Sequence, residues 1–263
     1  MQHGIRGLLI VMYGLGVTSA QPPTGRSPLA DSTSAPLSAS QKSAIKTQYE
    51  RVLKKFPIAV QQTPESVDVH SRRADALFFL GRFDEAVTEY KAMVKLNPRL
   101  DESHWRLGIA LFFADKSEQA VAQFEKYHSF DDVDRENGIW RYLSQFKATN
   151  AETAARELIR YEKDDREPFP AVYKLFDGSL SPEGALKTIS ESLSETERDK
   201  RLFYTELYIG MHCVVKNQPK LARKYLARSV ARKWPRHAGF GPEYMWHVGR
   251  VQLELLESAE AKL

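Results

Sequence analysis

The sequence contains few of the residues that build reactive or cross-linked sites. Cys213 is the only cysteine among 263 residues, so no disulfide can form within the chain. The seven histidines are scattered, and neither an HExxH motif nor the Cys/His spacing of a zinc site is present. A glycine-rich phosphate loop and a GxSxG motif are also missing. We therefore expect no catalytic residue, no metal site and no cofactor.

Three local pairs that could suggest chemistry have simpler interpretations. His212 and Cys213 are adjacent on an expected helix, where neighbouring side chains point roughly a third of a turn apart. We interpret Cys213 as a buried structural thiol. The carboxylate pairs Asp131-Asp132 and Asp164-Asp165 fall in expected turns, and we interpret them as capping and solubilising groups.

Neither basic nor acidic residues are in large excess. The chain has 38 basic and 34 acidic residues, a net charge of +4, which is too weak an excess to predict nucleic-acid binding. The exception is the stretch 200–236, which holds ten basic residues against the single acid Glu206. Its centre places four basic residues on one side of an expected helix: Lys220, Arg223, Lys224 and Arg228. We favour a solvated outer face, with weak association with membrane or cell wall as the alternative.

A long apolar run is confined to the start of the chain. Residues 8–17 are mostly apolar, with the basic Arg6 before them and the small residues 18–20 after them. A helix needs about 20 apolar residues to span a bilayer, so this pattern favours a secretory signal peptide. We predict a signal peptide over residues 1–20 and export to the periplasm, with a membrane tether if the segment is not cleaved. Residues 21–40, rich in Ser, Pro and Ala, predict a disordered tether.

From residue 41 onward the apolar spacing is helical, and no alternating strand pattern of useful length occurs. Two segments repeat each other at a spacing of 34 residues: 76–79 (ALFF) returns as 110–113, and Ala86-Val87 returns as Ala120-Val121. This period is typical of the tetratricopeptide repeat, a helix-turn-helix unit. We predict an all-α, right-handed superhelix (an α-solenoid) over residues 41–263. Its expected parts are clear repeats at 66–98, 101–131 and 203–235, degenerate helical repeats at 134–195, and a C-terminal capping helix at 241–258.

Small residues recur where the two helices of a unit must touch. They lie twelve residues apart in each clear repeat: Ala74 and Ala86, Gly108 and Ala120, Gly210 and Ala222. A larger side chain at such a crossing would overpack the core. We therefore expect these positions to be buried contacts between paired helices.

The first helix of each repeat is expected to line a concave face that binds proteins. On this register the face holds four apolar residues, which would suit an apolar or extended peptide: Phe78, Trp105, Ile109 and Phe112. The alternative is that these side chains pack as core. Arg72 and Arg106 lie on the same face and have the geometry to grip a carboxylate, or else pair with local acids.

The second half of the chain resembles a narrower family, the NlpI-type bacterial lipoproteins. The resembling stretches are 140–144 (WRYLS), 175–183 (LFDGSLSPE) and 193–197 (LSETE). The resemblance implies a periplasmic, homodimeric helical scaffold that presents clients to a tail-specific protease and binds peptidoglycan hydrolases. This chain lacks the lipidated cysteine, since no cysteine follows the apolar run. We expect an exported, non-enzymatic adaptor for envelope proteins, with a structural envelope protein as the alternative.

Overall fold

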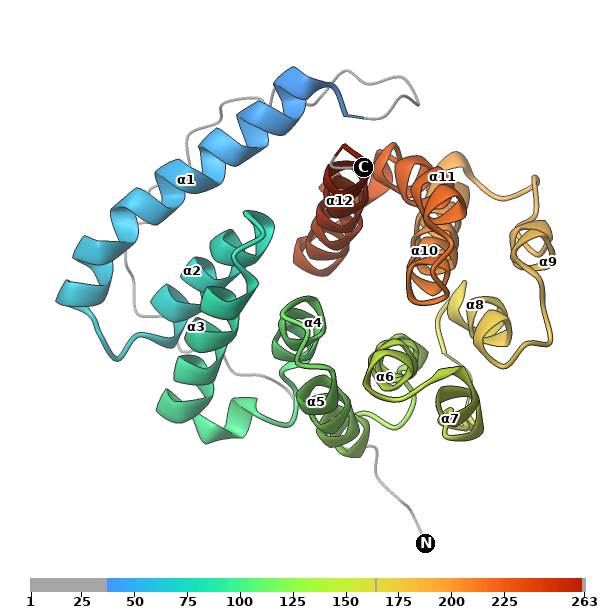
Figure 1. The fold of residues 1–263 in the computed structure, drawn as a ribbon, viewed down its shortest axis with the longest axis horizontal. Helices are drawn as coiled ribbons and strands as arrows, with labels where there is room; N and C mark the ends of the chain where they lie inside the picture. Colours follow the sequence, from blue (N-terminus) through green and yellow to red (C-terminus); the bar gives the residue numbers. More distant parts are fainter. Residues whose placement is uncertain (1–36, 164, 262–263) are drawn as a thin grey trace, which may run out of the picture. The chain divides into compact units, whose positions relative to one another are not determined.

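The computed structural model describes residues 37–163 and 165–261, which belong to one compact helical unit (Figure 1). Every regular element among these residues is a helix. The predicted all-α solenoid of helix-turn-helix units is confirmed. The predicted signal peptide lies outside the described residues, as does the predicted tether up to residue 36. The first helix, α1, begins at Ala39 and runs to Gln62.

The helices follow each other along the chain as antiparallel pairs. Two regular pairs come first: α2 (Val67–Phe79) with α3 (Phe83–Leu96), then the short helix η1 (Pro98–Leu100), then α4 (Trp105–Phe113) with α5 (Ser117–Phe130). Shorter elements follow: α6 (Arg135–Ala148), α7 (Ala151–Arg156), α8 (Phe169–Phe176) and α9 (Pro182–Lys187). The last elements are α10 (Glu195–Val215), α11 (Pro219–Val230), η2 (Trp234–His237) and α12 (Phe240–Glu260).

The turn inside three of these pairs has the same backbone geometry. Gly81, Asp115 and Asn217 have φ values of 75°, 58° and 53°, in the left-handed region that ends many helices. The amide of the next residue donates back across the turn each time, for example from Arg82 to Leu77 O at 2.9 Å. Glycine adopts this conformation without strain, and Asn or Asp tolerates it better than other residues. The three positions are 34 and 102 residues apart, so the repeat period sets them.

The small residues lie at the crossings of the paired helices. Ala74, Ala86, Ala120 and Ala222 are 0% exposed. A Cβ atom on Gly108 would lie 2.6 Å from the Phe124 ring, and one on Gly210 would lie 2.7 Å from Leu226 Cγ. Both distances are shorter than real contacts allow. The predicted close approach of paired helices is confirmed.

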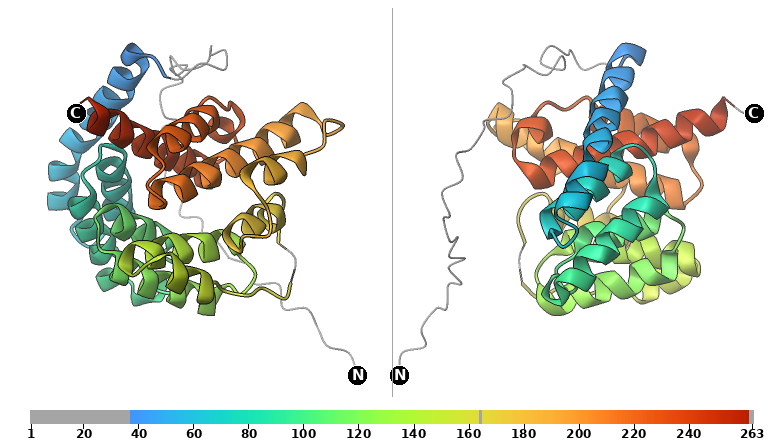
Figure 2. Two further views of the ribbon diagram at one scale, coloured as in Figure 1. Left: turned by 45° about the vertical axis from the view of Figure 1, so that its right-hand side comes forward. Right: turned by 90° about the vertical axis from the view of Figure 1, so that its left-hand side faces the viewer.

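The C-terminal helix does more than cover the last repeat. α12 packs on α11 and η2, and it also contacts α2. Its Tyr244 stacks on Phe78, while its His247 bonds to Tyr49 of α1 at 2.9 Å. In Figures 1 and 2, α12 lies beside α11, and the Lys42–Glu257 ion pair adds a second link from α1 to α12. The helix therefore joins the first repeat to the last, instead of only closing one end of the stack.

Candidate functional site

A pocket of about 480 Å³ lies among α4, α5, α6, α10, η2 and α12. This volume falls within the range of small-ligand sites, about 300–1,000 Å³. We call it the acidic–aromatic pocket. Its aromatic walls include Trp105, Trp140, Tyr204 and Trp234, and its charged lining consists of Asp131, Asp134, Glu136, Arg166 and Lys200.

The aromatic walls are held in place by ring contacts and a hydrogen bond between helices. Trp105, the first residue of α4, meets the Tyr244 ring edge-on with 4.9 Å between centroids. Trp140 of α6 is buried, and its Nε1 donates to the Tyr208 hydroxyl at 3.2 Å. Tyr204 of α10 packs against Trp234 of η2 at 5.8 Å. Because α4, α6, α10 and η2 each supply one ring, the pocket requires the assembled helices.

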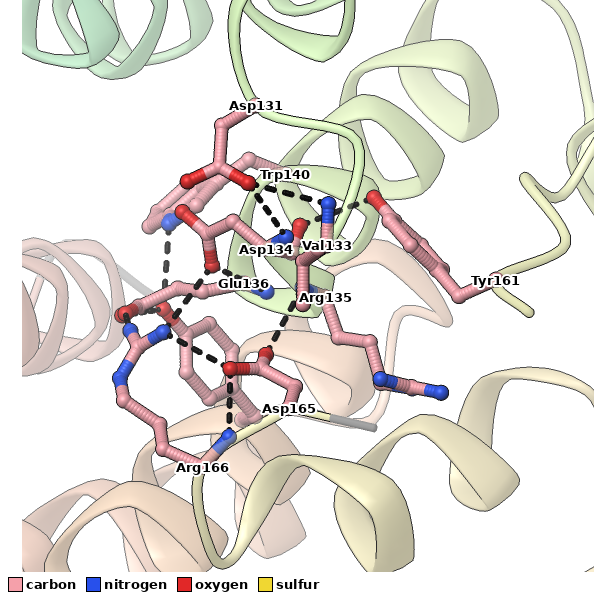
Figure 3. Close-up of polar contacts among 10 residues, drawn as sticks. Asp131, Val133, Asp134, Arg135, Glu136, Trp140, Tyr161, Asp165 and Arg166 are labelled. Atoms are coloured by element: carbon pink, nitrogen blue, oxygen red, sulfur yellow. Dashed lines mark hydrogen bonds and ion pairs between the residues drawn. The ribbon is translucent and has the colours of Figure 1, made fainter. Parts of the chain in front are cut away.

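One arginine gathers three carboxylates beside these rings (Figure 3). Arg166 Nη2 lies 2.6 Å from Glu136 Oε2, and its Nη1 lies 3.3 Å from Asp134 Oδ1 and 3.2 Å from Asp165 Oδ1. We call these four residues the Arg166 cluster. With one guanidinium facing three carboxylates, the cluster has a formal charge of −2 when all three acids are ionised.

The start of α6 draws these acids together. Asp134 is the N-cap residue of α6, and its Oδ1 accepts the Glu136 amide at 3.0 Å. Asp165 Oδ2 accepts the Arg135 amide at 2.9 Å, although Asp165 comes from the segment before α8. Asp131 Oδ1 accepts the Val133 amide at 3.0 Å, at the end of α5. The interpretation of Asp131 and Asp165 as capping groups is confirmed, while Asp164 lies outside the described residues.

Burial changes the ionisation of the cluster. It raises the pKa of Glu136 to about 7, against the opposing effect of Arg166 and with a smaller contribution from Asp134. Burial also raises the pKa of Asp134. The Tyr208 hydroxyl donates to Glu136 Oε1. Burial therefore disfavours the ionised form of Glu136, and the negative charge of the pocket depends on pH.

One buried acceptor on the pocket lining, Asn137 Oδ1, has no hydrogen-bond partner in the described part of the chain, and one oxygen of the half-buried Asp131 accepts no hydrogen bond there. Asn137 is 3% exposed, and its Nδ2 donates to Phe124 O at 3.1 Å, whereas its Oδ1 is unpaired. Both hydrogen bonds to the Asp131 side chain go to Oδ1, which leaves Oδ2 free. Leaving a buried acceptor unpaired costs about 1–3 kcal/mol. A bound group that donates hydrogen bonds would recover this energy.

The structure brings only two of the four predicted groove residues to this pocket. Trp105 and Ile109 line it. Phe78 and Phe112 are 0% and 2% exposed and belong to the core. The Phe78 ring stacks on Tyr244 of α12, with 5.4 Å between centroids. Phe78 and Phe112 therefore follow the alternative interpretation from the sequence, in which these side chains pack as core, and α12 covers part of that face.

Both predicted carboxylate-gripping arginines pair with local acids. Arg106 forms a buried ion pair with Asp75 at 2.7 Å and also donates to Ser71 Oγ at 3.0 Å. Arg72 pairs with Asp68 at 3.0 Å, one helical turn away on the surface. Arg106 is thus already satisfied within the fold, and the alternative interpretation from the sequence describes both residues.

The basic face of α11 is partly neutralised by acids from the neighbouring helices α10 and α12. Arg223 pairs with Glu260 of α12, and Arg228 pairs with Glu206 at 2.6 Å. Lys224 lies over the Tyr225 ring at 5.5 Å, and Lys220 is exposed. These contacts favour the interpretation of a solvated outer face.

We next consider a reactive thiol, a metal site and a membrane-spanning helix among the residues that the structure describes. Cys213 is buried, and burial raises the pKa of its thiol. Within 37–163 and 165–261, no group of three or more His, Cys, Asp or Glu side chains could hold a metal ion. None of the helices placed by the structure combines the length and apolar character needed to cross a membrane.

Sequence reasoning missed most of the pocket. Asp134, Glu136 and Arg166 lie in the degenerate repeats, where the period gives no register, and Tyr204 lies at the start of the clear repeat 203–235 but did not stand out there. Asp131 stood out only as half of an acidic pair in a turn. The short Asp-x-x-Asp spacing from 131 to 134, ahead of a helix, is the one local signal that a charged helix start would form there.

Comparison with known proteins supports the repeat assignment over part of the chain. A family model described as TPR repeat matches residues 74–112, from the middle of α2 to the end of α4. A search of curated proteins finds no match to this chain. With its all-helical architecture, the protein is a tetratricopeptide-repeat solenoid, a fold whose repeats generally act as protein-binding modules.

Proposed function

We propose that this protein is a non-enzymatic scaffold that binds a protein partner through the acidic–aromatic pocket. Tetratricopeptide-repeat proteins are typically scaffolds, and α12 already covers part of the face where a peptide was expected. The observation that carries the proposal is the pocket itself, which has a volume of about 480 Å³. It is lined by the half-buried rings of Trp105 and Trp234 and by a buried acceptor, Asn137 Oδ1, that has no partner in the described residues. Aromatic anchors at the centre of an interface supply much of its binding energy.

A finer proposal concerns the setting of this scaffold. We propose that the protein is an exported adaptor in the bacterial envelope and that its signal peptide, residues 1–20, is cleaved. We propose further that it acts as a homodimer and presents clients to a protease or to peptidoglycan hydrolases. The support is the signal-like start of the chain and the order of the NlpI-like stretches. Cell fractionation and the intact mass of the exported chain test the export. Sedimentation of the purified chain tests the dimer.

The binding role is tested by affinity capture from envelope extract with the chain lacking residues 1–20. Wild type is compared with Trp105→Ala, which removes a pocket wall, and with Lys220→Ala, a matched truncation on the outer face of α11. We expect wild type and Lys220→Ala to retain the same partner and Trp105→Ala to lose it. Equal capture by Trp105→Ala, at an unchanged melting temperature, would refute a role for the pocket.

A further inference from the structure

We propose that the acidic–aromatic pocket recognises a positively charged side chain, Lys or Arg, presented by the partner polypeptide. This inference rests on the proposed function and names the chemistry of the partner. Three features of the pocket support it: its charge, its aromatic walls and its unpaired acceptors.

The first feature is an excess of negative charge. The Arg166 cluster holds one guanidinium against three carboxylates, of which Asp165 is not part of the pocket lining. Burial raises the pKa of Glu136 and Asp134, so the negative charge of the cluster grows as the pH rises. The other cation of the lining, Lys200, has its ammonium 3.3 Å from Glu197. Asp131 adds a further carboxylate that no cation pairs with in the described residues. An anionic group entering the pocket would be repelled, while a cation would be attracted.

The second feature is the aromatic lining beside these acids. Trp105, Tyr204 and Trp234 reach the pocket from three different elements. The faces of such rings carry negative potential and attract ammonium and guanidinium groups. They also suit the apolar stem of a Lys or Arg side chain. A hydrated metal ion would gain nothing from these rings, so an organic cation is the better fit.

The third feature is the pair of unpaired acceptors. Asn137 Oδ1, on a side chain that is almost fully buried, has no partner in the chain as described. Asp131, a half-buried residue of the same lining, accepts hydrogen bonds in the described residues only at Oδ1. Ammonium and guanidinium groups are donors only, with three and five N–H bonds respectively. A cationic side chain would thus satisfy both acceptors without bringing an acceptor of its own.

Capped peptides with one variable central residue, flanked by Gly and Ser, provide the probe. Binding to the chain lacking residues 1–20 is followed by calorimetry, with Arg, Lys, norleucine or Glu at the centre. We expect Arg and Lys peptides to bind at least about tenfold more tightly than the norleucine peptide, because only they make charge-assisted hydrogen bonds. The Glu peptide should not bind. Binding of the free diamine 1,4-diaminobutane is measured in parallel. If the diamine binds more tightly than the peptides, the proposal that the cation belongs to a polypeptide is wrong.

Two neighbouring acids give a matched pair of variants. Asp131→Asn removes charge from the pocket but keeps the oxygen that caps the turn. Asp132→Asn makes the same change one residue along, at an exposed acid that pairs with Lys163 and does not line the pocket. We expect Asp131→Asn to weaken binding of the Arg peptide about tenfold. Asp132→Asn should leave it unchanged.

Several outcomes would contradict the proposal. Equal weakening by both variants would show unspecific attraction to a negative surface. Norleucine binding as tightly as Lys would show an apolar pocket. If the captured partner depends on Trp105 while the peptides show no preference for a cation, this inference fails and the scaffold role stands. If Trp105→Ala captures the partner normally, the scaffold role through this pocket fails as well.

Discussion

At the scale of single residues, the pocket depends on acids whose positions are set by backbone capping. Asp131, Asp134 and Asp165 each accept a backbone amide at the start of α6 or in the turn before it. Carboxylates at a helix N-terminus are favoured by the free amides and the helix dipole. Capping therefore collects the acids, and Arg166 offsets their repulsion. Glu136 is the member whose ionisation burial changes most clearly.

We predict that Glu136 makes the protein less stable as the pH rises toward neutrality. Its pKa is raised from 4.5 to about 7, so the folded state favours the protonated form. The resulting contribution to stability is fully present below about pH 4.5 and is lost as the pH rises through 7, up to about 3 kcal/mol. Glu136→Gln resembles the protonated acid and should lose this part of the pH dependence. Urea unfolding at pH 5, 6, 7 and 8 measures it.

The comparison needs a control, because other buried groups also titrate. Glu118→Gln makes the same chemical change at an exposed position on α5. It should leave the pH dependence of the free energy of unfolding as in wild type. The groups that act on Glu136 are Arg166, Asp134, Tyr208 and Asp165. If the free energy of unfolding changes with pH equally in Glu136→Gln and in wild type, the pKa of Glu136 is not raised.

At the scale of elements, paired helices approach closely because each clear repeat holds small residues at the crossing. The repeat period places these residues, and the same period places the left-handed turn at 81, 115 and 217. Both features involve only neighbouring helices. They were therefore readable from the sequence, since a helix-turn-helix unit buries its apolar face against its own partner.

We predict that Gly108→Ala destabilises the protein by about 1–3 kcal/mol. The new methyl group would lie 2.6–2.9 Å from three atoms of the Phe124 ring, which is fully buried and stacks on Trp140. This overpacking outweighs the gain of roughly 1 kcal/mol expected for alanine over glycine in a helix. Thermal and urea unfolding measure the change.

Gly241→Ala is the control for this substitution. A Cβ atom at Gly241, in the first turn of α12, meets nothing within 4 Å. The substitution should be neutral or slightly stabilising. A stability of Gly108→Ala equal to that of Gly241→Ala would show that the α4–α5 crossing is looser than the structure indicates.

At the scale of the whole helical unit, α12 decides which surfaces remain open. It reaches back to α1 and α2 through Tyr244, His247 and Arg250. The Arg250 guanidinium is buried and donates to Phe79 O at 2.6 Å and to His247 Nδ1 at 3.1 Å. Burial holds the pKa of His247 well below its usual value, with a further contribution from the Arg250 charge. The imidazole thus stays neutral and its Nδ1 accepts from Arg250.

We predict that Arg250→Met loosens the contact between α12 and the first repeat. The substitution keeps much of the side-chain volume but leaves Phe79 O and His247 Nδ1 without their donor, at a cost of about 1–3 kcal/mol. Hydrogen exchange should speed up in α1, α2 and α12 and remain unchanged in α10. Faster exchange spread evenly over all helices would contradict this specific link and indicate general destabilisation.

The sequence by itself determined the repeat period, the helix pairs, the turns and the small residues at the crossings. These features depend on contacts between neighbours in the chain, and such contacts leave a regular pattern. Only the tertiary structure decided which of the four predicted protein-binding residues pack in the core, and where the pocket lies. Tyr244 meets Phe78 across 166 positions of the chain, and Tyr208 meets Glu136 across 72. Contacts at such separations have no periodic signature, because they depend on where the folded repeats carry the end of the chain.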